Sequence, residues 1–424
     1  MKYENLFSEM TLRDVTFPNR IMRTSMVSGL ATEEGHVTDD LIARYQREAR
    51  GGVGSIVVEA AVVLPSRSSY NLRISDDSFT KELEDLVRSI HDANPRTRIG
   101  IQIMHFLKIA RSGWRQRVSD FKPEDLPVIV RQHADAAERA LKAGFDFIEL
   151  HMAHGYLLHE FLGAHTRPGK YGGGFENRTR ILRDIIAGIR ASGNKIELGV
   201  RLSAFDFVPF KPDPTLSQPG KLGPGIPEDF SHCLPYRYGF GVNASHPVEA
   251  DLIETIQFVR LCAELGVKIV NLSAGSPYYN PHIQRPAIYP PSDGYQPPED
   301  PLVGVARQIN AVRQIRAQAP SSLVIVGTAY SYLQEYLPHV AQHVVRNRWA
   351  DSIGLGRMVL AYPTILTDAV EKGTLTTKLI CRTFSDCTTA PRNGMISGCY
   401  PLDKYYTGKA EFQQLREVKR AVGV

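Results

Sequence analysis

The chain has 424 residues, 43% of them hydrophobic, which is enough to bury a large core. Its formal net charge of +5 is small and its basic residues are scattered, which argues against a nucleic-acid partner because such partners need a concentrated basic surface. No run of about 18 apolar residues occurs, so we expect no transmembrane helix and no membrane partner. The N-terminus is polar and lacks the apolar stretch of a signal peptide, so we expect a cytoplasmic protein.

The first third of the chain alternates short apolar runs with amphipathic segments. Apolar runs bounded by glycine predict buried strands, and apolar residues three or four positions apart predict helices. An N-terminal arm, residues 1–19, precedes them. On this basis the sequence predicts strands at 19–27, 55–58 and 98–105, and helices at 39–50, 83–91 and 127–143.

The most informative stretch is residues 145–190. It opens with an apolar run at 145–150, which predicts a strand, and His151, His154 and Tyr156 follow at once. A loop rich in glycine and arginine comes next, and residues 177–190 have helical spacing. Polar side chains between a strand and a helix lie, in a (β/α)8 barrel, at the end that carries active sites.

These three side chains suit proton transfer next to a carbonyl or phenolate oxygen. The two imidazoles can donate hydrogen bonds to such an oxygen, and the Tyr156 phenol can deliver a proton. Two other interpretations stay open. His-x-x-His can bind a metal, although no Glu lies between these histidines and no third ligand is obvious nearby, and both histidines can be purely structural.

The second half of the chain continues the alternation, with strands predicted at 196–202, 267–273, 323–329 and 350–357 and helices at 251–265 and 302–317. Arg201 lies on an otherwise apolar strand, where a guanidinium is costly unless it has a partner. Two long stretches, 207–250 and 274–300, lack periodicity. Long loops of this kind are often functional. We expect residues 207–250 to form a lid or an oligomer contact. We expect residues 274–300 to line a pocket or to pack on the surface.

Strands seven and eight both end in glycine-rich segments, at Gly327 and at Gly356-Arg357. In (β/α)8 barrels these two positions form a common phosphate site, where backbone N–H groups and a guanidinium contact the anion. The sequence therefore predicts an α/β fold, a TIM barrel over residues 1–375 with long catalytic-face loops, followed by a C-terminal arm at 376–424. A cofactor-free barrel lyase that binds a phosphorylated substrate also fits these observations.

Residues 151–178 resemble the signature of the Old Yellow Enzyme family. The family pattern His-x-x-His-Gly-Tyr-Leu-x-x-x-Phe-Leu is intact from His151 to Leu162, and Tyr171-Gly172-Gly173 and Glu176-Asn177-Arg178 are also present. The segment between them is shortened and loses the usual Asn and Asp. Further matches are Gln102, the Val-Arg-Leu-Ser-Ala run around Arg201, and residues 356–363. Residues 25–30 are most similar to the dienoyl-CoA reductase branch.

The resemblance implies an FMN enzyme that takes hydride from NADH or NADPH and reduces an activated C=C bond of an unsaturated carbonyl compound. It implies that His151 and His154 polarise the carbonyl oxygen and that Tyr156 protonates the α-carbon. Val27 replaces a residue that usually donates a hydrogen bond to the flavin, and valine cannot donate. On this interpretation the protein binds a small-molecule substrate, and the sequence is compatible with a homo-oligomer. The residues implied in FMN binding are Ser25, Met26, Val27, Ala60, Gln102, Arg201, Gly327, Thr328, Gly356 and Arg357. A flavin-dependent amine dehydrogenase or demethylase with a separate electron-transfer partner is the alternative.

Cysteine usage bears on a metal centre. Five cysteines, an odd number, argue against a disulfide framework. In longer relatives four cysteines in this region hold an iron–sulfur cluster. Cys381, Cys387 and Cys399 match three of them, but Phe384 stands in the second place and cannot ligate iron. We therefore expect no iron–sulfur cluster, with a three-cysteine cluster or a zinc site as the alternatives.

Overall fold

The computed structural model of the protein describes residues 3–12, 15–65, 70–105 and 121–423. Its centre is a closed barrel of parallel strands in which each strand pairs with the next along the chain, and the last pairs with the first through Ile353 and Ile21. The predicted (β/α)8 fold is therefore confirmed. The barrel strands are β3 (Ile21–Arg23), β4 (Ser55–Val62), β6 (Arg98–Met104), β7 (Phe147–Met152), β8 (Glu197–Ser203), β11 (Ile269–Ser273), β12 (Val324–Gly327) and β13 (Ser352–Leu355).

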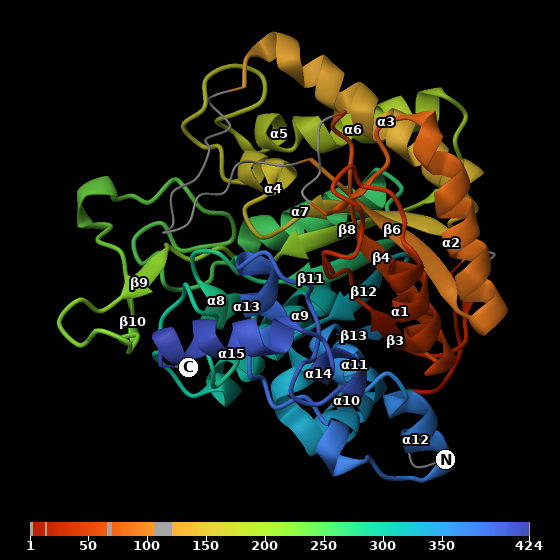
Figure 1. The fold of residues 1–424 in the computed structure, drawn as a ribbon. Helices are drawn as coiled ribbons and strands as arrows, with labels where there is room; N and C mark the ends of the chain where they lie inside the picture. The colour runs from red at the N-terminus through yellow and green to blue at the C-terminus, as the bar shows by residue number, and fades with distance from the viewer. Residues whose placement is uncertain (1–2, 13–14, 66–69, 106–120, 424) are drawn as a thin grey trace.

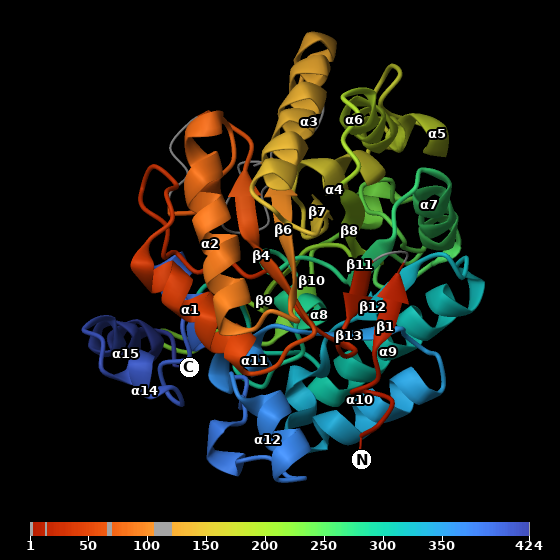
Figure 2. The same cartoon turned by 90° about the vertical axis from the view of Figure 1, so that its right-hand side faces the viewer.

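Helices between successive strands form an outer layer around the barrel (Figures 1 and 2). Their apolar faces pack onto the outward-facing strand residues, as in α6, where Ile181, Leu182, Ile185 and Ile189 are buried. The helices between strands are α1 (Asp39–Arg50), α2 (Thr80–Ala93), α3 (Leu126–Lys142), α6 (Arg180–Ala191), α7 (Ile253–Glu264), α9 (Pro301–Gln318) and α10 (Leu337–Arg346), and α11 (Arg357–Ala361) and α12 (Ile365–Glu371) follow β13.

We call the end of the barrel where the strands begin the lower end, and the end where they finish the upper end. The inside of the barrel is apolar at its lower end. Met22, Val57, Phe147 and Ile269 form a cluster there with Phe17. Phe17 belongs to an antiparallel hairpin of β1 (Met10–Leu12) and β2 (Val15–Phe17), whose other apolar side chains pack against the same cluster. The lower end is therefore closed, and the polar side chains of the barrel interior gather at the other end.

The upper end carries the irregular segments. Residues 207–250 contain a small hairpin of β9 (Phe210–Pro212) and β10 (Gly225–Pro227), and residues 274–300 contain α8 (Pro281–Gln284). Two short helices, α4 (Leu157–Leu162) and α5 (Phe175–Arg178), precede α6. The two-residue strand β5 (Leu72–Arg73) pairs with β4.

The C-terminal arm folds back along one side of the barrel, next to α1 (Figures 1 and 2). Its helices are α13 (Asp386–Arg392), α14 (Lys404–Thr407) and α15 (Glu411–Ala421). Arg44 of α1 donates to the Ser397 carbonyl at 2.9 Å, and Arg47 pairs with Asp403 at 2.6 Å. Tyr400, Tyr406 and Leu415 give the arm a small buried cluster of its own.

Two local differences from the sequence prediction concern the central stretch. The strand was predicted at 145–150, but β7 extends to Met152, so His151 is a strand residue in register with Arg201. Where a loop was expected, Leu157–Leu162 forms α4, because its apolar residues are buried. Among the helices of the described residues, none is both long and apolar enough to cross a membrane.

Candidate active site

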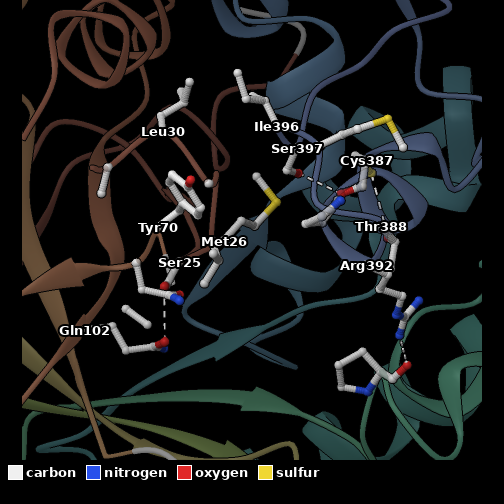
Figure 3. A pocket seen from close by; sticks show the side chains of 18 of the residues that line it. Ser25, Met26, Leu30, Tyr70, Gln102, Cys387, Thr388, Arg392, Ile396 and Ser397 are labelled. Carbon is white, nitrogen blue, oxygen red and sulfur yellow. Dashed lines mark hydrogen bonds between the residues drawn. The ribbon is translucent and has the colours of Figure 1, made fainter. Parts of the chain in front are cut away.

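A cavity of about 1370 Å³ opens at the carboxyl end of the barrel strands, between the strand ends and the C-terminal arm (Figure 3). The strands contribute the side chains predicted to be reactive, and the arm contributes the opposite wall. The predicted residues that line the cavity are Ser25, Met26, Val27, Ala60, Gln102, His151, His154, Tyr156, Arg201 and Arg357.

The two imidazoles lie side by side at the end of β7. His151 Nε2 and His154 Nδ1 are 3.3 Å apart, and His154 Nε2 lies 2.9 Å from Ser273 Oγ. His154 and Gly155 both adopt positive φ, 64° and 79°, which turns the chain sharply after the strand. A side chain at Gly155 would press on the Tyr279 ring, so glycine suits this position.

The His154 turn is held by neighbouring strand ends. Its backbone N–H donates to Ser203 Oγ at 3.0 Å, and its carbonyl accepts a hydrogen bond from Ser276 Oγ at 2.9 Å. Ser203 and Ser276 belong to the ends of β8 and of the segment after β11. The position of His154 is therefore fixed by three successive strand ends and not by its own loop alone.

Tyr156 is buried and touches both another phenol and an imidazole. Its hydroxyl lies 2.8 Å from the Tyr278 hydroxyl, and its ring centroid is 4.5 Å from that of His151. Tyr278 is 38% exposed, so it connects the buried phenol with the solvent side of the cavity. The Arg392 guanidinium lies 5.8 Å from the Tyr278 ring and adds positive charge there.

Burial sets the protonation state of these groups. Burial lowers the pKa of His151 to about 3, with Arg201 adding to the effect, and it lowers the pKa of His154 well below its ordinary value. Both imidazoles are therefore neutral at pH 7. Burial, followed by the contact with Tyr278, raises the pKa of Tyr156 well above that of a free phenol, so this residue holds its proton.

Below the histidines, the barrel interior contains a polar layer. Gln102 Nε2 donates to Glu149 Oε1 at 2.7 Å, and Asn271 Nδ2 donates to Glu149 Oε2 at 2.8 Å. Ser25 Oγ donates to the other end of the Gln102 amide, Oε1, at 3.1 Å (Figure 3). Arg201 lies opposite Asn271 in the β8–β11 register, and its Nε and Nη1 have no hydrogen-bond partner among the described residues.

Two guanidinium groups make this part of the cavity positive. Burial lowers the pKa of Arg357 to about 10, and the positive charges of Arg285 and Arg201 act in the same direction. That pKa still leaves Arg357 charged at pH 7, and no hydrogen bond or ion pair joins its guanidinium to another described residue. Arg201 and Arg357 can therefore bind an anionic or electron-rich ligand.

The remaining predicted residues lie behind the cavity wall. Gly327 ends β12, Thr328 Oγ1 donates to the Leu272 carbonyl at 2.8 Å, and Gly356 caps α11 beside Met26. None of these three lines the cavity. Their assignment to a phosphate site stays a prediction.

Part of the cavity wall was not predicted from the sequence. The 274–300 loop was expected to line a pocket or to pack on the surface, and its Tyr278 does line the cavity, but the arm was interpreted for its cysteines alone. The structure places Cys387, Thr388, Pro391 and Arg392 of α13 and residues 394–397 on the cavity wall. The apolar and aromatic residues of the arm predict that it packs against the rest of the protein, but they do not predict which surface it contacts.

The three arm cysteines meet around a small space of about 20 Å³, together with Arg285, Arg357 and Phe384. All three are free thiols, and burial raises the pKa values of Cys381 and Cys399. The Phe384 ring packs against Tyr289 at 5.6 Å. Three cysteine side chains and a phenyl ring, which cannot ligate iron, around room for about one water molecule do not fit a four-thiolate iron–sulfur cluster.

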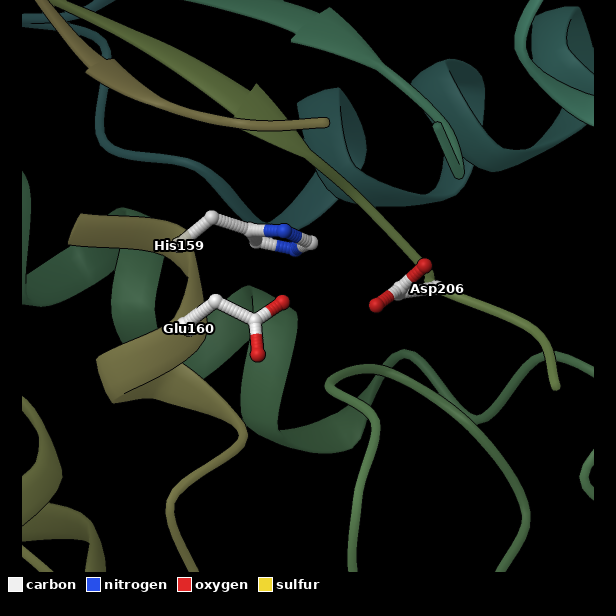
Figure 4. Close-up of side chains that lie close together, drawn as sticks. All are labelled: His159, Glu160 and Asp206. Carbon is white, nitrogen blue, oxygen red and sulfur yellow. The ribbon is translucent and has the colours of Figure 1, made fainter. Parts of the chain in front are cut away.

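Among the described residues, His159, Glu160 and Asp206 form a group of potential metal ligands, with ligand atoms within 4.8 Å of one another (Figure 4). His159 Nδ1 accepts the Gly155 N–H at 3.0 Å, and the Asp206 carboxylate accepts the Tyr279 hydroxyl at 2.9 Å. The first bond ties the Gly155 turn to α4, and the second joins the segments that follow β8 and β11, so we interpret the group as structural.

The fold and cavity define a (β/α)8 barrel protein whose positive, donor-lined site suits a large anionic ligand. The model of the NADH:flavin oxidoreductase / NADH oxidase family matches residues 5–125 and 114–215. An NADH oxidase from Thermoanaerobacter brockii is 32% identical over 293 residues, which are 64% of this chain and 44% of that protein. This chain therefore spans less than half the length of that relative.

Solved structures share the fold. An Old Yellow Enzyme homologue from Zymomonas mobilis is 21% identical with a TM-score of 0.60, over 88% of this chain and 94% of that one. Histamine dehydrogenase from Rhizobium sp. 4-9 is also 21% identical, with a TM-score of 0.67, over 95% of this chain and 52% of that one. The chain belongs to the NADH:flavin oxidoreductase / NADH oxidase family, which confirms the resemblance to Old Yellow Enzyme found in the sequence.

Proposed function

We propose that the protein is an FMN-dependent NAD(P)H oxidoreductase of the ene-reductase type. The observation that carries this proposal is the arrangement of one cavity. Paired neutral imidazoles and a protonated phenol lie at the end of β7, next to Arg201, two of whose nitrogens have no partner in the described part of the chain. This combination of groups suits the binding of an electron-rich ring system and the protonation of a substrate beside it.

The residues of the cavity fit FMN. The buried Nε and Nη1 of Arg201, which no described residue contacts by a hydrogen bond, would donate to the electron-rich pyrimidine edge, and Gln102 would offer an amide there. Arg357, which has no ion-pair partner among the described residues, would contact the phosphate. Bound FMN would supply the hydride chemistry, accepting hydride from NADH or NADPH and passing it to the C=C bond.

The chain's own groups would do the rest. His151 and His154 would exchange their mutual hydrogen bond for bonds to the carbonyl oxygen, where negative charge develops as the double bond is reduced. They are suited to this because both are neutral donors at pH 7. Tyr156 would protonate the α-carbon, since burial keeps its proton in place until a strong base forms beside it.

An amine dehydrogenase that uses a separate electron acceptor is the second candidate, because histamine dehydrogenase has the same fold. The two reactions differ in the compound that supplies electrons to the flavin. An ene-reductase takes electrons from NAD(P)H and gives them to an enone, whereas an amine dehydrogenase takes them from the amine. A cofactor-free lyase would need no flavin at all.

The test is anaerobic spectroscopy of the purified protein after incubation with FMN. We expect NADH or NADPH to bleach the bound flavin, 2-cyclohexenone to restore its colour, and histamine or trimethylamine to leave the oxidised form unchanged. Bleaching by an amine would favour the dehydrogenase, and failure to bind FMN would refute both flavin reactions. In His154→Ala we expect colour recovery with the enone to slow at least tenfold; an unchanged rate would refute the carbonyl contact.

A further inference from the structure

The buried carboxyl group of Glu149 has no part in the proposed chemistry and lies directly beneath it. Glu149 is on β7, two residues before His151, and is 1% exposed. Its side chain points into the barrel, in register with Gln102 on one side and Gly199 on the other. Burying a carboxyl group is costly unless hydrogen bonds or charges compensate it, so this position requires an explanation.

The hydrogen bonds of Glu149 determine which way two amide side chains point. Both oxygens of the Glu149 carboxyl group accept a hydrogen bond from an NH2 group, that of Gln102 at 2.7 Å and that of Asn271 at 2.8 Å, which is the pattern of an ionised carboxylate, a group that can only accept. The Gln102 oxygen is thereby left on the cavity side, where it accepts from Ser25 Oγ. Without the carboxylate, the Gln102 amide can turn over and present its NH2 group to the cavity.

The charge of Glu149 also acts on the same space. Burial raises its pKa, and the charge of Arg201, followed by the bonds from Asn271 and Gln102, opposes that rise. In turn, Glu149 is the group whose charge counteracts the effect of burial on Arg201. The negative charge of Glu149, which lies deeper in the barrel, therefore partly cancels the positive potential that Arg201 creates in the cavity.

We propose that Glu149 is a positioning residue that fixes the Gln102 amide with its oxygen towards the cavity and limits the positive potential of Arg201. This proposal rests on the proposed function, because the group it acts on is bound FMN. With the Gln102 oxygen towards the cavity, a hydrogen-bond donor of bound FMN would face that oxygen. FMN gains negative charge when it is reduced, so the Glu149 charge also keeps its midpoint potential low.

The test is Glu149→Gln, which keeps the shape of the side chain and removes its charge. We expect the oxidised cofactor to bind at least fivefold more weakly, because Gln102 loses its fixed orientation. We also expect the reduced form to bind about tenfold more tightly relative to the oxidised form, which is a positive shift of about 30 mV in the two-electron potential. Fluorescence titration gives the affinity and anaerobic dye equilibration gives the potential.

The matched control is Glu84→Gln, which removes the same charge from the half-exposed surface of α2. It should leave both the affinity and the potential unchanged. Glu149→Asp keeps the charge but withdraws the carboxylate from Gln102. We expect it to weaken FMN binding with little change in the potential, and it provides the affinity test if Glu149→Gln does not fold.

The outcomes separate this inference from the proposed function. If the unmodified protein binds FMN and Glu149→Gln has an unchanged affinity and potential, the role of Glu149 is refuted and the function stands. If Glu149→Gln changes both and Glu84→Gln neither, the inference is supported. If the unmodified protein binds no FMN, the function fails, and the inference fails with it.

Discussion

Replacing Arg201 with methionine tests the link between the buried charge layer and cofactor binding. Methionine fills a similar volume but can donate no hydrogen bond. Arg201 Nε and Nη1 are unpaired among the described residues, so bound FMN would gain one or two charge-assisted hydrogen bonds there. Such bonds contribute about 1.5–3 kcal/mol each, so the loss of one should weaken FMN binding by about 10- to 150-fold.

The same replacement also affects the protein without cofactor, for a different reason. Arg201 and Glu149 attract each other without an ion pair at 4.0 Å or less, so the lost attraction is below about 4 kcal/mol, the value for two charges 4 Å apart at an effective dielectric constant of 20. Removing two buried donors that lack partners among the described residues returns about 1–3 kcal/mol for each of them. Because the two effects oppose each other, the stability of the apoprotein should change by no more than about 2 kcal/mol.

Two assays separate these effects. Quenching of FMN fluorescence measures the dissociation constant, and urea unfolding of the apoprotein measures the free energy of unfolding. Arg88→Met, on the exposed face of α2, is the control for the substitution itself and should change neither. The double variant Arg201→Met with Glu149→Gln should regain any lost apoprotein stability but not FMN affinity. If Arg201→Met binds FMN within twofold of the unmodified protein, the assignment of Arg201 to the cofactor is refuted.

Three further predictions concern the groups above this layer. Tyr156→Phe should slow reoxidation of the reduced protein by an enone at least tenfold while NADPH still reduces it at the normal rate; equal slowing of both half-reactions in stopped-flow traces would contradict a proton-donor role. Tyr278→Phe removes a contact that raises the pKa of Tyr156, so the basic limb of the pH profile for enone reduction should move to lower pH, and an unmoved limb would exclude this coupling. His151, with a pKa of about 3 when folded and about 6.5 when unfolded, binds fewer protons in the native state between these values, so stability should fall as the pH drops below 6.5, by about 2 kcal/mol at pH 5. Urea titrations from pH 5 to pH 8 should show a smaller loss in His151→Gln, and parallel curves would show that the imidazole is not buried neutral.

The barrel could be predicted from the sequence because its signals are local and repeated. Each unit has an apolar run and an amphipathic helix, and tertiary packing preserved both, as in α1, whose predicted ends are those of the structure. The end of β7 was predicted less well. His151 is polar and so reads as the first residue after the strand, yet it continues the pairing with Arg201 because the barrel interior is polar at this level.

The candidate site could be predicted only where single side chains carry a recognisable chemistry. His151, Tyr156 and Arg201 met that condition, and the structure brings them to one cavity. The contact between Tyr156 and Tyr278 could not be predicted, because it joins residues 122 positions apart through a loop without periodicity. Glu149 gave no signal either, since one acidic residue in an apolar run does not reveal that two amides turn towards it.

The wall formed by residues 387–397 has a consequence for how members of such a family diverge. In a barrel whose pocket is shaped by many separate βα loops, a new ligand preference requires coordinated changes at several distant places in the gene. Here a substantial part of the wall is one continuous stretch of chain, which Arg44 anchors to α1 at Ser397, while Arg47 anchors the following segment at Asp403. Recombination or drift within that stretch can reshape the cavity while β7 and β8, which carry the reactive groups, keep their sequence.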